Sequence, residues 1–426
     1  EALYVLKKFA TEIVGTKNYT TTDLFSLRSF FQNLGGQLAT HRDIRYAKTI
    51  VLIGGDPGEL QPLTGKQIRQ AVRNGGTTLV LVNSVPIRLR EQAKIFLHIR
   101  PGTEDAIALA LAAPSNASLA AKKAGIETSE IDAAREAIAN TTGDVVVMFS
   151  HQVSNAAQAL IAQLPQSLAA EGRRFLFHPL PFFNNSIGAH DMGMMDMPVS
   201  PVQLLEAAGN EINALYMAGS FLPQHLKGHE DALSKLDFLV VQELFENETT
   251  AAADVVLPAA SYAEQDGTFT NNDGLVQRVR QSIAPLHQSK PDWMIVAQLA
   301  RELGVDFGYD MSASAVFREI GERVPAYAGM RYPLLKDETN PVQAKYQVAG
   351  AGDLSAELEA VRNQVESLPD TGEKVTVTPD VGTELFRLGM LTDKVAQFHL
   401  LANGNPRPET TAVSPLYQIK SASSAV

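Results

Sequence analysis

The chain contains 426 residues with no cysteine, 45% hydrophobic and 19% charged residues, and a formal net charge of -11. The absence of cysteine excludes disulfides, thiolate-bound iron–sulfur or zinc sites and a cysteine nucleophile within these residues. The length exceeds what one hydrophobic core usually supports, so we expect two or three domains. The acidic balance argues against nucleic acid or an anionic membrane as the main partner.

The first residues already carry apolar side chains at helical spacing, namely Ala2, Leu3, Leu6, Phe9, Ala10 and Ile13. The chain starts at Glu1 rather than Met and shows no signal-peptide pattern. We therefore expect an amphipathic helix at the start, and a chain that is a fragment or a processed product.

Short β-branched runs then alternate with amphipathic stretches, which predicts α/β units around mainly parallel sheets. The expected strands, in chain order, are Thr49–Ile53, Leu79–Val82, Asp144–Phe149, Phe175–Phe177, Ala214–Met217, Phe238–Val241 and Val255–Leu257. After the first strand we expect a helix that buries Leu63, Ile68, Ala71 and Val72 and ends at Asn74-Gly75-Gly76. A later helix is expected over Ser129–Asn140, with Ser129 and Asp132 resembling a capping box.

A strand followed by Gly and a small polar residue occurs twice, after Ile53 and after Met217, and each is followed by a further strand at a spacing that fits a βαβ crossover. Two Rossmann-like units with a crevice at the carboxyl ends of their strands are therefore predicted. We expect an N-terminal helical segment at 1–44 packing with the second unit, the first unit at 45–204 and the second at 205–335. An irregular C-terminal tail at 336–426 would include a helix over Ala356–Ser367.

Three stretches could carry chemistry. Asn184–Gly193 is rich in amides and glycine, and it suits either a ligand-closing loop or, as we favour from the residues alone, a satisfied polar turn. The acids Asp254, Glu264, Asp266 and Asp273 suggest acid–base chemistry or a metal, although the Asp-Gly and Asn-Asn pairs around them are also typical of turns. His225 and His229 are a weak metal signal, and isolated histidines such as His151 and His178 are more often structural.

Taken in order, several short motifs resemble the molybdopterin oxidoreductase superfamily over roughly residues 1–335. These motifs are Gly15–Asn18, Gly54–Pro57, Ile99–Thr103, Asn184–Gly193, Ala253–Pro258, Glu264–Asn271, Gln277-Arg278 and Asp292-Trp293. The resemblance implies two Rossmann-like domains that hold the two dinucleotide halves of a bis-pterin cofactor, preceded by an N-terminal iron–sulfur cluster domain. It also places the family's metal-ligating side chain at Ser26, with Asp23 close by.

The sequence departs from that family in three places. Ser26 lies in a stretch whose simplest interpretation is a helix with a buried apolar side. Asn83 follows the second strand, where the family often has an Asp-Pro-Arg whose acid can hold guanosine. The remaining residues leave no room for the large C-terminal barrel of catalytic members.

These departures, and the segment Val324–Met330, make the chain most similar to the large iron–sulfur subunits of proton-pumping NADH:quinone oxidoreductase, respiratory complex I. That resemblance implies a cofactor-free scaffold with no catalytic or metal-ligating residue, beside clusters borne by the missing N-terminal domain. Its partners would be that domain and other peripheral-arm subunits, in the cytoplasm and peripheral to the inner membrane. A vestigial pterin-dinucleotide site would remain at Gly55, Asp56, Pro57, Asn83, Asn185, Gly267 and Asn271.

Two alternatives stay open. The first is a catalytic molybdenum or tungsten bis-pterin oxidoreductase of the formate dehydrogenase type, in which Ser26 or Asp23 would hold the metal. The second is a relic fold that binds one nucleotide in its crevice for stability.

Overall fold

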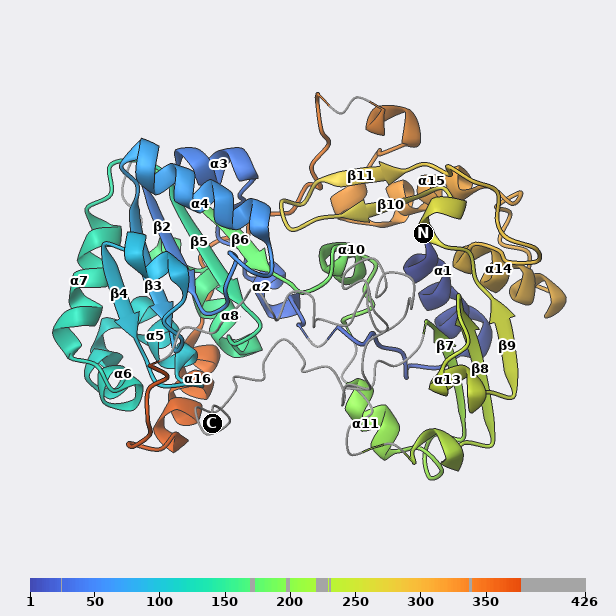
Figure 1. Ribbon diagram of the computed structural model, residues 1–426, viewed down its shortest axis with the longest axis horizontal. Helices are drawn as coiled ribbons and strands as arrows, with labels where there is room; N and C mark the ends of the chain where they lie inside the picture. Colours follow the sequence, from blue (N-terminus) through green and yellow to red (C-terminus); the bar gives the residue numbers. More distant parts are fainter. Residues whose placement is uncertain are drawn as a thin grey trace, which may run out of the picture.

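The computed structural model describes residues 1–23, 25–168, 173–196, 200–219, 229, 231–336 and 339–376. Figure 1 shows two lobes side by side, each built on its own parallel sheet, with the short helix α10 (Ser186–Asp191) between them. The chain passes between the lobes more than once, so each lobe combines segments that are distant in sequence. No helix in the described part of the chain is long and apolar enough to cross a membrane.

The first lobe contains a six-stranded parallel sheet in the order β1-β6-β5-β2-β3-β4. The strands are β1 (Gln37–Leu38), β2 (Thr49–Ile53), β3 (Thr78–Asn83), β4 (Ile95–His98), β5 (Val145–Ser150) and β6 (Phe175–Leu180). From β2 the chain moves outward to β3 and β4, and it then returns to place β5 on the other side of β2. Open α/β sheets bind ligands beyond the carboxyl ends of two strands that diverge in this way. The topology therefore directs attention to the loops after β2 and β5.

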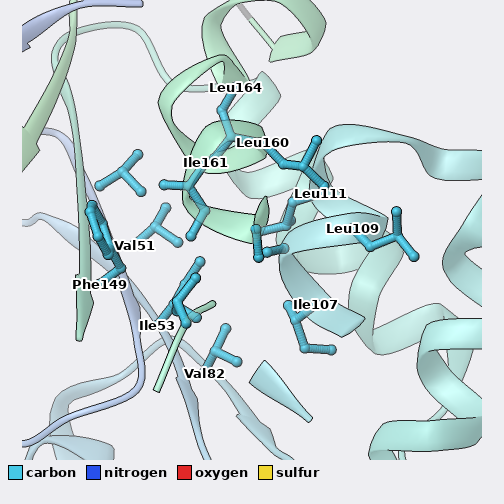
Figure 2. Packing of buried hydrophobic residues seen from close by; sticks show 14 of the residues in the cluster. Val51, Ile53, Val82, Ile107, Leu109, Leu111, Phe149, Leu160, Ile161 and Leu164 are labelled. Atoms are coloured by element: carbon cyan, nitrogen blue, oxygen red, sulfur yellow. The ribbon is translucent and has the colours of Figure 1, made fainter. Parts of the chain in front are cut away.

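Helices cover both faces of this sheet, because strands that are apolar on both faces must be shielded on both. Figure 2 shows one face, where Val51, Ile53 and Phe149 of the strands meet Ile107 of α5 (Glu104–Ala112) and Ile161 of α8 (Asn155–Ala162). All of these side chains are fully buried, and burial of a large aliphatic or aromatic side chain stabilises by about 1.5–3 kcal/mol. The opposite face is covered by α3 (His41–Tyr46) and α4 (Pro62–Gly75).

The second lobe contains a three-stranded parallel sheet, β7-β8-β9, and an antiparallel hairpin, β10-β11. Its strands are β7 (Ala214–Ala218), β8 (Phe238–Glu243), β9 (Val255–Pro258), β10 (Gly267–Thr270) and β11 (Val276–Val279). The N-terminal helix α1 (Ala2–Lys8) packs here, since Val5 shares a core with Trp293 of α14 (Asp292–Glu302). Lys8 also forms a 2.8 Å ion pair with Glu319 of α15 (Ala313–Arg323).

The remaining helices complete the two lobes. They are the π-helix η1 (Phe9–Val14), α2 (Arg28–Gln32), α6 (Ala117–Ala124), α7 (Thr128–Ala139), α9 (Leu164–Leu168), α11 (Pro201–Glu206), α13 (Glu248–Ala251) and α16 (Ser355–Ser367). Helix α16 packs against the first lobe, where Val361 and Val365 are fully buried. The buried Lys123 of α6 stabilises the carboxyl end of α16 by donating to the carbonyl oxygens of Glu366 (2.9 Å) and Leu368 (2.5 Å).

The predicted fold class, two Rossmann-like units with mainly parallel sheets, is confirmed. Two local predictions were wrong. Leu63 is 67% exposed, because the buried side of α4 uses Thr64 and Gly65 instead. The capping box of α7 is formed by Glu127 and Glu130, not by residues 129 and 132. The domain boundaries at 44, 204 and 335 stay a prediction.

Candidate functional site

The loop after β2 lies against the turn after β5. Gly54 and Gly55 both have left-handed backbone conformations, with φ of +69° and +73°. A Cβ atom on Gly54 would lie 2.6 Å from Oε1 of Gln152, and the Gly55 N–H donates to that same oxygen at 2.7 Å. Only glycine tolerates this backbone conformation and this close approach together. The two glycines therefore set the shape of the loop after β2.

Asn83 at the end of β3 fixes the same loop from the other side. Its side chain is 2% exposed. Its Nδ2 donates to the carbonyl oxygen of Gly55 at 2.7 Å, and its Oδ1 accepts from the Val85 N–H at 2.9 Å. Both ends of the Asn83 amide therefore bind backbone groups, so an asparagine at this position stabilises the shape of the loop.

Asp56 and Pro57 continue this loop towards α4. Oδ1 of Asp56 accepts from the Gly58 N–H at 2.9 Å, and burial raises the pKa of this carboxyl group while the nearby Arg69 and Arg88 lower it. The carbonyl oxygen of Pro57 would lie 2.8 Å from a Cβ atom on Gly65, so the loop packs directly on the helix backbone.

Two buried acceptors at this edge lack a hydrogen-bond donor within the described residues: Oε2 of Glu59 and Oε1 of Gln61. The other end of the Gln61 amide donates to the carbonyl oxygen of Pro181, just after β6. A buried acceptor without a partner costs about 1–3 kcal/mol, so such atoms mark places where a ligand can supply the missing donors.

Between the lobes, Asn185 links α10 to the hairpin of the second lobe. Its Oδ1 accepts from the Thr270 N–H at 2.8 Å, and a Cβ atom on Gly188 would lie 2.2 Å from that oxygen. Gly267 is the first residue of β10. Oδ1 of Asn271 accepts from the backbone N–H groups of Asp273 (3.0 Å) and Leu275 (2.9 Å). The structure thus brings the predicted interlobe residues to one region, where the side-chain oxygens of both asparagines hold backbone.

The end of α10 carries two perturbed ionisable groups. Asp191 accepts hydrogen bonds from the hydroxyls of Tyr346 (2.8 Å) and Tyr327 (3.0 Å), and burial raises its pKa to about 7. His190 stacks on Phe31 with ring centroids 4.5 Å apart. Its buried Nδ1 has no hydrogen-bond partner among the described residues, and burial lowers its pKa to about 4. His190 is therefore neutral at pH 7 and retains capacity for a ligand.

The predicted metal position lies in the segment before α2. Asp23 is buried, and its carboxylate already accepts from Ser186 Oγ and from the Phe25 N–H at 3.0 Å. Ser26 is half-buried, and its Oγ accepts a long 3.4 Å bond from the Arg28 N–H. The expectation that Ser26 lies in a helix was wrong, since α2 begins at Arg28. Of the two oxygens, that of Ser26 is the freer to bind a metal.

A cavity of about 440 Å³, which sequence analysis did not find, lies between the N-terminal segment and the second sheet. Thr16 and Asn18 of the first motif and the adjacent Tyr19 line it, together with Tyr216 of β7 and Gly219 just after that strand. Its size falls in the range of small-molecule sites.

Three of the four candidate acids have structural roles. Asp254 accepts from the Leu239 N–H at 2.7 Å, Glu264 accepts from the Ser261 N–H at 2.8 Å, and Asp266 pairs with Arg278 at 3.1 Å. His225 lies outside the described residues, so the histidine pair is not described as a site.

Comparison with known proteins gives the family. A model of the molybdopterin oxidoreductases matches residues 1–302. The F420-dependent formate dehydrogenase subunit alpha of Methanocaldococcus jannaschii is 28% identical over 410 residues, covering 78% of this chain and 60% of that protein. A provisionally named formate dehydrogenase of Staphylococcus aureus is 26% identical over 409 residues, covering 79% of this chain and 41% of that protein. The chain thus spans less than two thirds of the length of these relatives.

A solved structure supports the fold. Acetylene hydratase from Pelobacter acetylenicus superposes with a TM-score of 0.60 at 14% identity, covering 80% of this chain and 58% of that one.

The expectation of a cofactor-free scaffold in NADH:quinone oxidoreductase was wrong. The similar proteins are named formate dehydrogenases, and a family defined by molybdopterin implies a molybdenum or tungsten pterin cofactor. The error came from giving weight to Asn83, whose side chain serves the loop, and to a helix around Ser26 that the structure does not contain. The expected NADH dehydrogenase partners and peripheral-arm position have no support.

Proposed function

This chain belongs to the molybdopterin oxidoreductase family, and on that basis we propose that it forms the cofactor-binding lobes of a molybdenum- or tungsten-dependent formate dehydrogenase. The observation that carries the proposal is the similarity to named formate dehydrogenases across more than three quarters of the chain. The Methanocaldococcus relative is named as a subunit, so we also propose that partner subunits carry the electrons onward.

In the first lobe, the glycine loop after β2 and the polar residues around it fit one dinucleotide half of the pterin cofactor. Purine N–H groups are donors, and Oε2 of Glu59 and Oε1 of Gln61 are buried acceptors that receive no donor from the described part of the chain. Arg69 and Arg88, whose charges act on Asp56, would offset phosphate charge. In this arrangement Gly55, Asp56, Pro57 and Asn83 shape the loop that the nucleotide contacts.

Between the lobes, the amide nitrogens of Asn185 and Asn271 would donate to the cofactor, since their oxygens hold the backbone of the hairpin. Gly267 begins β10 beside Glu1, whose side-chain carboxylate accepts from the Thr268 N–H at 2.9 Å.

Ser26 is the proposed metal-ligating side chain. When bound, the metal–pterin centre would accept two electrons from the substrate, which is chemistry that the cofactor supplies. The protein would bind and orient formate, an anion, through the positive charge of Arg28, two residues from Ser26. Arg28 is close enough to His190 to lower the pKa of that imidazole further, so the two side chains belong to one neighbourhood. Neutral His190 would hydrogen-bond the substrate through its unpaired Nδ1.

The experiment uses the complete natural protein, purified from cells supplied with molybdate and tungstate. We expect stoichiometric molybdenum or tungsten, guanine nucleotide released on denaturation, and formate-dependent reduction of an artificial dye. Ser26→Ala should abolish dye reduction and leave guanine content unchanged. Ser29→Ala, a half-buried serine on the neighbouring helix α2, is the matched control. Folded protein with neither metal would contradict the proposal, and unchanged activity in Ser26→Ala would remove Ser26 from it.

A further inference from the structure

A cluster of three potential metal ligands joins the two lobes at the turn between β10 and β11, two residues beyond Asn271. His41 begins α3, His178 lies on β6, and Asp273 occupies the turn between β10 and β11. The two histidines therefore come from the first lobe and the aspartate from the hairpin of the second. His178 is fully buried and Asp273 is 2% exposed, whereas the side chain of His41 is 29% exposed. The cluster is thus open to solvent on one side only.

The carboxylate of Asp273 faces both imidazoles. Its Oδ2 lies 3.3 Å from Nδ1 of His41, and its Oδ1 lies 3.7 Å from Nδ1 of His178. Oδ2 also accepts from the His41 backbone N–H at 3.0 Å, but buried Oδ1 has no hydrogen-bond partner within the described residues. A buried carboxylate oxygen without a donor is costly, so the site holds an unmet need for a positive partner.

The spacing is close to that of a metal site. Metal–ligand distances of about 2.0–2.1 Å place the ligand atoms of a tetrahedral zinc site about 3.3–3.4 Å apart. Oδ2 of Asp273 lies 3.3 Å from His41 and Oδ1 lies 3.7 Å from His178, and one ligand atom from each of the three residues lies within 4.8 Å of the others. We propose that His41, His178 and Asp273 bind a divalent transition metal such as Zn²⁺, which joins the first lobe to the β10-β11 hairpin.

Metal-bound histidines usually donate from their second nitrogen, which fixes the ring orientation. Oγ1 of Thr64 lies 3.1 Å from Nε2 of His41 and can accept in this way. Nδ2 of Asn272, which lies 3.0 Å from Nε2 of His178, is a donor, so this amide would have to rotate to present its oxygen.

Metal binding changes the proton position on His178 without changing its charge. Without metal, Nδ1 lies 3.0 Å from the carbonyl oxygen of Ala39, which suits a proton on Nδ1. With metal on Nδ1, the proton would sit on Nε2, where the Oγ1 of Thr64 (3.4 Å) or a rotated amide of Asn272 accepts it. A water on the open side, beside His41, would complete the four ligands.

The experiment is a Zn²⁺ titration of the complete protein after dialysis against a chelator, followed by calorimetry and thermal unfolding. We expect one saturable site and a rise in Tm with Zn²⁺. His41→Gln should weaken binding by at least about tenfold and remove the rise in Tm. Because His41 is partly exposed, this variant is expected to fold, and Asp273→Asn provides a second test.

The matched control is His287→Asn, which removes an exposed histidine with a left-handed backbone conformation that asparagine tolerates. It should bind Zn²⁺ like the parent. Absence of saturable binding by the parent protein, or equal binding by His41→Gln, would overturn the proposal. Zinc is counted separately from molybdenum and tungsten, so this result is independent of the proposed function.

Discussion

Replacing Asn83 by alanine tests whether one buried amide stabilises the loop after β2 in the first lobe. The substitution removes the 2.7 Å bond to the Gly55 carbonyl and the 2.9 Å bond from the Val85 N–H. Asn83 is 2% exposed, so the space that its amide leaves is buried, and it offers the two backbone groups no replacement partner. Each unsatisfied group costs about 1–3 kcal/mol, so the free energy of unfolding should fall by about 2–5 kcal/mol.

The assay is urea unfolding followed by far-UV circular dichroism, because the single tryptophan reports on the second lobe. Asn140→Ala, at an exposed residue beyond the end of α7, is the control and should change stability by no more than about 0.5 kcal/mol. A loss at Asn83 no larger than that of the control would refute the role assigned to this amide.

Asn83→Asp sharpens the test, because it installs the acid that the family often has there. The new carboxyl keeps an acceptor for the Val85 N–H, but its second oxygen faces the Gly55 carbonyl. Only the protonated form can donate to that carbonyl, so the folded-state pKa of the new acid is raised. The free energy of unfolding of the variant, relative to the parent, is then highest at low pH. It falls as the pH rises from the unfolded pKa of the new acid, about 3.9, through its folded pKa. A stability gap to the parent that stays constant between pH 4 and pH 8 would contradict this account.

Three further predictions use matched pairs or pH. Gly54→Ala should destabilise the protein more than Gly76→Ala, because both residues have positive φ but only Gly54 has an atom within 2.6 Å of the added Cβ; urea midpoints measure the difference. Burial raises the pKa of Glu104 from 4.5 to about 6, so the contribution of Glu104 to the free energy of unfolding falls as the pH rises through that interval. Above pH 6, the free energy of unfolding of Glu104→Gln should therefore exceed that of the parent by about 2 kcal/mol more than it does below pH 4.5. Lys123→Met should speed amide exchange in α16, whereas the exposed neighbour Lys122→Met should leave it unchanged, as hydrogen-exchange mass spectrometry would show.

The sheets were predictable because their strands are continuous apolar runs. β2 and β5 are buried along their whole length, and no helix would bury so short a run on every side. Four strands, β1, β4, β10 and β11, were not among those expected. Each has only two to four residues; β4, for example, is Ile95–His98 at the edge of its sheet and ends in a polar residue. The error at Leu63 has a different cause. The buried side of α4 needs small residues, since Gly65 lies against the Pro57 carbonyl, and apolar periodicity cannot detect such a contact.

The motifs pointed to the loops at the candidate site, but the bonds that build these loops depend on pairs distant in sequence. Asn83 and Gly55 are 28 residues apart, Asn185 and Thr270 are 85 apart, and Gly55 and Gln152 are 97 apart. No local pattern states which partner an amide will take. The cluster of His41, His178 and Asp273 is a stronger case, because its members lie in three separate elements and have no spacing signal.

The asparagines whose side chains bind backbone groups limit what a substitution can reveal about ligand binding. The side-chain oxygens of Asn83, Asn185 and Asn271 all hold backbone, so replacing any of them alters the shape of a loop before it alters a ligand contact. Among the described residues near these loops, buried side-chain atoms of Glu59, Gln61 and His190 have no hydrogen-bond partner, and they hold no backbone. A substitution at these positions removes an unpartnered buried polar atom from the free protein and removes a contact from the loaded one. Its effects on stability and on cofactor retention should therefore have opposite signs, and that opposition separates a ligand-binding residue from a structural one.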